Sequence, residues 1–273
     1  MFANVNGIRL YYESHGAGQP VVLVHGLGLS SDMWHYQVPA LAERYHVITV
    51  DNRGFGQTSK PKGPYEMGMY VEDLLQLIDF LGFEKPVLIG LSMGGGIAQS
   101  FALAHLDRVL ALGLISTGSD HTDSSRAKFF SSADTVEREG MSPFIEAVVP
   151  KYFGPDSLRN RPSDVARILQ TELANDPSAW AAAARVNGTR NWTQQLDRIT
   201  CPVVYIGGAL DPSAPRRAET YPKYLPDVEV HLLPGVAHLL PLEVPEKVNE
   251  LLLRFLDRVH VKTGTSAPGG FPS

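Results

Sequence analysis

The sequence predicts an α/β fold with a mostly parallel, eight-stranded sheet that is flanked by helices and interrupted by an inserted helical lid. Three observations predict it. Short continuous apolar runs, typical of strands buried on both faces, alternate with segments of helical periodicity over most of the chain. Reactive or turn-forming residues follow five of these runs, at the strand ends where parallel sheets bind ligands. Strand-like runs disappear between residues 118 and 192, where short helical segments alternate with polar turns.

The composition indicates a globular chain and argues against two classes of partner. The 273 residues include 24 basic and 29 acidic side chains, and the net charge of −5 disfavours nucleic acid or a membrane surface as the partner. No apolar run approaches the roughly 18 residues that cross a bilayer, and the first residues lack the features of a signal peptide. We therefore expect a cytoplasmic protein, monomeric or homodimeric. The single cysteine, Cys201, excludes an intrachain disulfide and a cysteine metal cluster.

The elements follow in order from the apolar pattern and from start and stop signals. Asn6-Gly7 favours a hairpin turn before a strand at 8–13, and 21–24 is a strand buried on both faces. Ser31 or Asp32 is a suitable cap for a helix that runs to about Arg44. The remaining strands are expected at 47–50, 86–89, 109–115, 203–206 and 228–233, and the remaining helices at 66–81, 95–105, 165–173, 178–186, 214–224 and 246–259.

These elements predict a core that is built from two separate parts of the chain. The tail beyond the last helix is rich in Gly, Pro, Ser and Thr, so we expect it to be disordered. The expected segments are the core at 1–117 and 193–261, the helical lid at 118–192 and the disordered tail at 262–273.

The stretch Gly90-Leu91-Ser92-Met93-Gly94 organises the chain, because it lies between a predicted strand and a predicted helix. The pattern G-x-S-x-G in this context is typical of a nucleophile elbow, whose sharp turn strains the serine backbone and lifts its hydroxyl clear of the sheet. Gly90 and Gly94 fit this interpretation because a Cβ at either position would meet the neighbouring backbone. A glycine-rich turn with a surface serine is the alternative.

A serine hydroxyl needs a base, and the base needs a group that orients it. His238 lies in the loop after the last predicted strand, and Asp211 follows the strand before it. The order Ser, Asp, His along the chain is that of a hydrolase triad. Asp211 precedes a proline and is also a suitable turn initiator, and Asp120 is the rival acid.

Backbone amides should meet the negative charge that develops on an attacked carbonyl oxygen. The amide of Met93 follows the nucleophile, and the turn His25-Gly26-Leu27-Gly28 supplies a second amide, which we assign to Leu27. We expect His25 to brace this turn and Asp51 to brace its own turn beside Arg53. For the walls of the binding pocket, which are largely apolar in most proteins, we expect Trp34, Met93, Phe129, Phe144 and Trp192.

Together these motifs resemble the α/β-hydrolase superfamily over nearly the whole chain apart from the lid and the tail. Residues 90–95 and Gly207-Gly208 are similar to 3-oxoadipate enol-lactonases, whereas 53–56 and 92–96 are similar to arylesterases with perhydrolase activity. The resemblance implies a cofactor-independent serine hydrolase that cleaves a small-molecule carboxylic ester or lactone through an acyl-enzyme. The nine histidines include no H-E-x-x-H motif, so we expect no metal.

Two alternatives to this function stay open. The same triad would serve an enzyme that hydrolyses carbon–carbon bonds of vinylogous diketones. A ligand receptor of this fold would keep Ser92, Asp211 and His238 but turn over very slowly.

Overall fold

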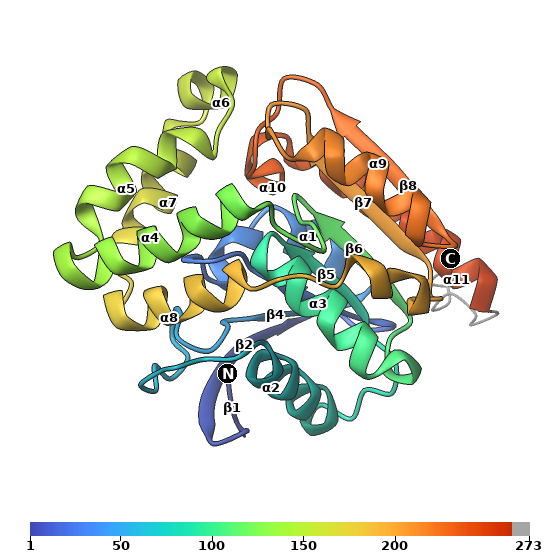
Figure 1. Cartoon of the computed structure of the whole chain (residues 1–273). Coiled ribbons are helices and arrows are strands. Elements are labelled where there is room, and N and C mark those ends of the chain that lie inside the picture. The colour runs from blue at the N-terminus through green and yellow to red at the C-terminus, as the bar shows by residue number, and fades with distance from the viewer. Residues whose placement is uncertain (264–273) are drawn as a thin grey trace.

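The computed structural model describes residues 1–263 and is built on one sheet of eight strands (Figure 1). The strand order is β1-β2-β4-β3-β5-β6-β7-β8, with antiparallel pairing up to β4 and parallel pairing beyond it. The predicted fold class is therefore confirmed. The strands are Phe2–Val5 (β1), Ile8–His15 (β2), Pro20–Val24 (β3), His46–Val50 (β4), Val87–Leu91 (β5), Ala111–Ile115 (β6), Val203–Gly208 (β7) and Val228–Leu233 (β8).

The apolar runs form the centre of this sheet. Every residue of β5, β6 and β7 is buried, as expected where helices cover both faces of parallel strands. In β8, at the edge, Leu233 alone is buried. The carboxyl ends of β3, β5 and β7 thus lie along one buried edge, where their following turns can meet.

Two helix pairs cover the sheet: α2 packs against α3, and α1 packs against α11. The predicted helices at 66–81 and 214–224 are confirmed within a residue or so of their expected ends. The helices of the core are Gln37–Ala42 (α1), Met67–Phe80 (α2), Met93–Ala104 (α3), Ala214–Tyr224 (α9), Leu240–Glu243 (α10) and Pro245–Thr263 (α11), with 3₁₀ turns at Ser31–Trp34 (η1), Leu106–Arg108 (η2) and Thr193–Arg198 (η4).

Between β6 and β7 the chain forms a set of helices, here called the helical insertion, which gathers on one side of the sheet in Figure 1. An isolated β-bridge between Asp120 and Asn191 joins its two ends. Its boundaries at 118 and 192 stay a prediction. Its elements are Asp123–Glu139 (α4), Ser142–Val148 (α5), Val149–Lys151 (η3), Pro155–Asn160 (α6), Pro162–Leu173 (α7) and Pro177–Gly188 (α8).

Two expected elements are wrong in detail. The single helix expected from Ser31 or Asp32 to Arg44 is divided into η1 and α1, and the residue before η1, Ser30, makes no capping bond. Pro39 explains the division, because a proline has no amide hydrogen for a helix that continues from the preceding turn.

The last helix also differs from the expectation. Helix α11 runs to Thr263, so the first two residues of the expected tail are helical, and 264–273 lie outside the described residues. No glycine or proline follows Pro245 until Gly264, so no stop signal ends the helix earlier. Within residues 1–263, no helix is long and apolar enough to span a membrane.

Candidate active site

Ser92 lies at the sharp turn between β5 and α3, with φ 53° and ψ −109°. This left-handed backbone is strained for a residue with a side chain. The flanking glycines make the turn possible, because a Cβ on Gly94 would lie 2.1 Å from the carbonyl oxygen of Val24, and one on Gly90 would lie 2.3 Å from the carbonyl carbon of Gly94. The turn therefore has the geometry of the elbow that the sequence predicts.

The carbonyl oxygen of Ser92 is held by two side chains that sequence reasoning missed. Thr117 Oγ1 donates to it at 2.6 Å, and Arg190 Nη1 donates to it at 3.2 Å. Arg190 Nη1 also donates to Thr117 Oγ1 and to the carbonyl of Gly118. Burial lowers the pKa of Arg190 to about 9. The elbow is thus fixed from behind by a buried guanidinium group of the helical insertion.

The imidazole of His238 is paired with Asp211. His238 Nδ1 lies 2.9 Å from Asp211 Oδ2, which also accepts a hydrogen bond from Arg217 Nη1 at 2.9 Å. The other carboxylate oxygen accepts from the Ser213 amide. Burial opposes ionisation of Asp211, but the hydrogen bonds from His238 and the Ser213 amide and the charge of Arg217 hold the pKa of this carboxyl below its ordinary value. An ionised carboxylate only accepts, so Nδ1 carries the proton and Nε2 of the neutral ring is a base.

The loop that carries His238 is fastened to the helical insertion. The amides of His238 and Leu239 both donate to the carbonyl of Tyr152, at 3.1 and 3.0 Å. The buried carboxylate of Glu243 accepts from the amide of Ala237 in this loop and from the amide of Gly154 in the insertion. The insertion therefore helps to set the position of the imidazole.

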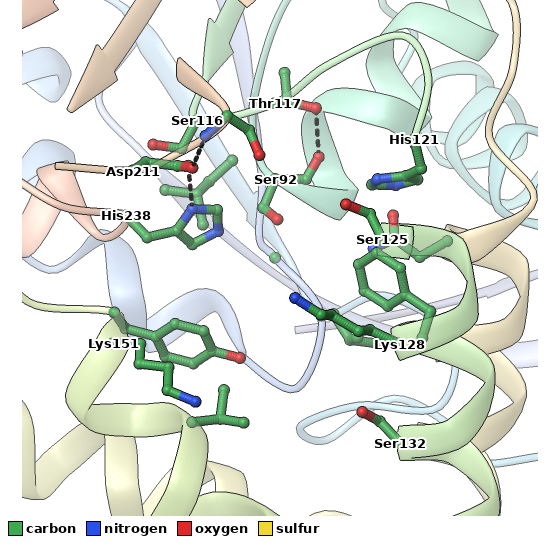
Figure 2. Close-up of a pocket in the computed structure, with 18 of the residues that line it drawn as sticks. Ser92, Ser116, Thr117, His121, Ser125, Lys128, Ser132, Lys151, Asp211 and His238 are labelled. Atoms are coloured by element: carbon green, nitrogen blue, oxygen red, sulfur yellow. Dashed lines mark hydrogen bonds and ion pairs between the residues drawn. The ribbon is translucent and has the colours of Figure 1, made fainter. Parts of the chain in front are cut away.

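Ser92, Asp211 and His238 line one pocket with a cavity volume of about 490 Å³, and Figure 2 shows them together on one wall. Among the described residues, no hydrogen bond joins the Ser92 hydroxyl to the His238 ring. Such bonds are often long in ligand-free enzymes and tighten when substrate binds. The topology therefore unites three side chains that are far apart in the sequence.

Both amides predicted for the oxyanion hole lie beside this wall. Leu27 and Gly26 line the pocket in the turn after β3. Met93 is the first residue of α3, so its amide has no acceptor within the helix and lies at the positive end of the helix dipole. The side chain of Met93 is fully buried and does not line the pocket.

His25 braces the turn of Leu27. Its Nδ1 lies 2.7 Å from the Gly26 carbonyl, and its Nε2 accepts from the Asn52 amide at 2.9 Å. Burial lowers the pKa of His25, which keeps the ring neutral, as one donated and one accepted bond require. The ring links the turn after β3 to the turn after β4.

The other predicted carboxylates have structural roles. Asp51 accepts from the amides of Ser31 and Gln57 and so braces its turn. Arg53 pairs with Asp73 instead of Asp51. Asp120 binds Arg216 through both oxygens, which excludes it as the partner of His238.

The aromatic residues expected to line the pocket divide into two groups. Phe129 and Phe144 line it, whereas Trp34 and Trp192 do not. Trp34 is completely buried at the end of η1, and Trp192 donates its indole hydrogen to Gln99 on α3. Trp34 is thus a core residue, and Trp192 is a partly buried residue that packs against the core.

Sequence reasoning also missed Glu172 on α7. Burial raises the pKa of Glu172 to about 8, and the indole of Trp180 opposes this effect only in part. The group lies against Gly28, in the turn that carries Leu27, and the carbonyl of Gly28 accepts from Asn175 Nδ2 at 2.7 Å. Among the side chains that the structure describes, no group of three His, Cys, Asp or Glu residues has the arrangement of a metal site.

A comparison with protein families decides the class of this fold and site. A model described as the alpha/beta hydrolase fold matches residues 19–245. The chain belongs to the α/β-hydrolase fold family. Among solved structures, this α/β hydrolase is similar to a thermophilic esterase from Thermogutta terrifontis determined with malate bound, at 32% identity and a TM-score of 0.89, over 95% of this chain and 98% of that one.

Two further solved structures have different named activities. The α/β hydrolase is 27% identical to an enol-lactonase from Burkholderia xenovorans, with a TM-score of 0.90 over 94% of this chain and all (100%) of that one. It is 28% identical to a bromoperoxidase from Bacillus anthracis, with a TM-score of 0.85 over 94% of this chain and 99% of that one. The family and these relatives support a hydrolytic enzyme.

Proposed function

We propose that this α/β hydrolase cleaves a small-molecule carboxylic ester or lactone through an acyl-enzyme, with Ser92 as nucleophile. The observation that carries the proposal is the 2.9 Å pairing of Asp211 with His238 on the wall of the pocket that Ser92 lines. The esterase and the enol-lactonase among its relatives support the choice of ester and lactone.

In the first half of the reaction, Ser92 attacks the substrate carbonyl while His238 Nε2 takes the hydroxyl proton. Asp211 keeps the proton on Nδ1 and stabilises the imidazolium that forms. The amides of Leu27 and Met93 donate to the oxyanion. The tetrahedral intermediate then collapses, and His238 gives its proton to the leaving alkoxide oxygen.

In the second half, water replaces the leaving alcohol. His238 takes a proton from the water, whose oxygen attacks the acyl carbon held by Ser92. The same two amides stabilise the second oxyanion, and the collapse returns the proton to Ser92 Oγ. With a lactone, the released alcohol and the acid belong to one molecule. Each step uses groups that the chain supplies, so the proposed reaction needs no cofactor.

Covalent labelling tests the nucleophile. A fluorophosphonate should add one adduct to the wild-type protein, at Ser92, as read by intact mass and peptide mapping. Ser92→Ala should abolish labelling and hydrolysis of a short-chain 4-nitrophenyl ester. Ser124→Ala, an exposed serine of α4 outside the pocket, should change neither. Unchanged turnover by Ser92→Ala would reject the assignment.

Turnover measurements with the wild-type protein distinguish this function from its two alternatives. Faster turnover of a vinylogous diketone than of any ester would replace the proposal with carbon–carbon bond hydrolysis. A single burst of product, equal to the enzyme concentration and followed by negligible turnover, would replace it with a slow receptor.

A further inference from the structure

The pocket is cationic although the chain as a whole is acidic. Lys128, Lys151, Arg190 and Arg217 line it, and among the described side chains of its wall Asp211 carries the one carboxylate. The whole chain has a net charge of −5. The cavity thus concentrates charge of the sign opposite to that of the protein.

Asp211 neutralises one of these cations at most. Its carboxylate binds both His238 and Arg217, so Arg217 already has its counter-ion. Within the part of the chain that the structure describes, Lys128, Lys151 and Arg190 form no ion pair. Among the side chains that the structure describes, three positive charges therefore line the cavity without a carboxylate paired to them.

Arg190 is the least expected of the three. It is 2% exposed, and its guanidinium is held by neutral acceptors: the carbonyls of Ser92 and Gly118, Thr117 Oγ1 and Asn187 Oδ1. Its Nε has no partner. Burying a cation without an acid is costly, so a purely structural role would favour a neutral side chain here.

His121 adds a neutral ring to the same wall. Burial and the charge of Arg190 lower the pKa of His121 to about 3, so the ring carries no charge at ordinary pH. Its Nε2 is buried without a partner, and the residue lines the pocket. The ring therefore adds no negative charge that would balance the cations of this wall.

The two lysines reach the cavity from opposite sides. Lys128 extends from α4 and Lys151 from η3, and Figure 2 shows both amines directed into the space below Ser92 and His238. Ser125, which lies on α4 like Lys128, also lines the pocket. Phosphate sites commonly use backbone amides at a helix N-terminus, whereas these donors are side chains on separate walls. This arrangement suits a carboxylate at one end of a flexible acyl chain.

We propose that the enzyme selects esters or lactones whose acyl part carries a free carboxylate, which Lys128 and Lys151 bind while Arg190 strengthens the positive potential at the reacting end. The inference rests on the proposed function, because it assigns the substrate class of that same site. On this proposal, the substrate carboxylate balances the positive charge of the pocket.

Two esters of equal length test this inference. 4-Nitrophenyl pentanoate and the mono-4-nitrophenyl ester of glutaric acid differ in the end of the acyl chain, a methyl group against a carboxylate. The wild type should have the lower KM for the glutarate ester. Lys128→Gln together with Lys151→Gln should raise that KM about tenfold or more and change the pentanoate KM far less. Lys223→Gln, an exposed lysine of α9 away from the pocket, is the matched control.

Ionic strength gives an independent reading of the same charge. Added salt should raise KM for the glutarate ester and not for the pentanoate ester, because exposed lysines are screened. Equal effects of the double substitution on both esters, or a lower KM for pentanoate, would overturn the proposal.

A binding experiment separates this proposal from the hydrolase proposal. Glutarate should bind to the Ser92→Ala variant in calorimetry, and the double lysine substitution should abolish the binding. Binding without turnover of either ester by the wild type would reject the hydrolase function and keep the carboxylate site. Pentanoate hydrolysis without glutarate binding would reject the carboxylate site and keep the hydrolase function.

Discussion

The carboxyl group of Glu172 lies so close to Gly28 that a Cβ on Gly28 would stand 2.0 Å from Glu172 Oε2. Asn175, one turn further along the chain, donates to the carbonyl of the same glycine at 2.7 Å. The end of α7 is thus packed onto the turn that presents the Leu27 amide. A shift of this helix would move one of the two proposed oxyanion donors.

Alanine at Gly28 should therefore damage both stability and catalysis. Gly28 has φ +76° and no room for a methyl group, whereas Gly82 has φ +71° and nothing within 4 Å of its added Cβ. Gly82→Ala should cost about 1 to 2 kcal/mol of unfolding free energy and leave kcat unchanged. Gly28→Ala should cost more and lower kcat by up to about 100-fold. Denaturant unfolding and ester kinetics check this, and equal behaviour of the two variants would contradict it.

Glu172 should make the protein less stable as pH rises. The unfolded chain releases the proton of this carboxyl near its ordinary pKa of 4.5, whereas the folded protein holds it until a pKa of about 8. The folded state binds more protons between these values, so stability falls across that interval and levels off above it. Glu172→Gln should flatten this part of the curve of Tm against pH. Glu219→Gln, at an exposed site on α9, should follow the wild type.

Asp211→Asn should reduce kcat about 10⁴-fold with little change in fold. An amide can donate to His238 Nδ1, which would place the ring proton on Nε2 and remove the base. The control is Asp120→Asn, since Asp120 binds Arg216 outside the triad. Steady-state kinetics with a 4-nitrophenyl ester decide between them. A comparable loss in both variants would contradict the assignment of the acid.

The buried pair of Arg53 and Asp73 should behave as one unit. Burial raises the pKa of Asp73, and two hydrogen bonds from Arg53, at 2.8 and 2.6 Å, oppose that effect. Arg53→Met should cost about 3 to 5 kcal/mol, because it leaves a buried carboxyl without its cation. Adding Asp73→Leu should restore much of the loss in urea unfolding, whereas Arg138→Met, at an exposed pair, should change little. Additive losses in the double variant would refute the coupling.

Local patterns were sufficient to predict most of the framework. The apolar runs of β3, β5 and β7 are short and buried on both faces, so they stand out without tertiary information. Ser92 could be predicted because Gly90 and Gly94, two residues away on either side, are required where the backbone passes too close for a Cβ. Asp211 and His238 followed from their order and from the strands that precede them.

The rest depends on contacts between distant segments. Arg190, Glu172 and Tyr152 reach the site from the helical insertion, and no short pattern encodes where such helices come to rest. Trp34 and Trp192 failed as wall residues for the same reason, since an aromatic side chain suits a core and a pocket equally well. The break between η1 and α1, in contrast, has a local cause in Pro39.

The bridge between Asp120 and Asn191 brings the exit and the return of the helical insertion to one place beside two adjacent strands, β6 and β7. A segment with such closely spaced ends can be exchanged as a cassette, because a chimera that carries another relative's helices keeps the order and pairing of the strands. Divergence in substrate preference can then proceed in the cassette while the reacting groups on the sheet stay in place. A grafted segment would have to reproduce three contacts to keep the enzyme active. These are the Tyr152 carbonyl that accepts from the loop of His238, the Arg190 guanidinium that donates to the Ser92 carbonyl, and the end of α7 that packs on the turn of Leu27.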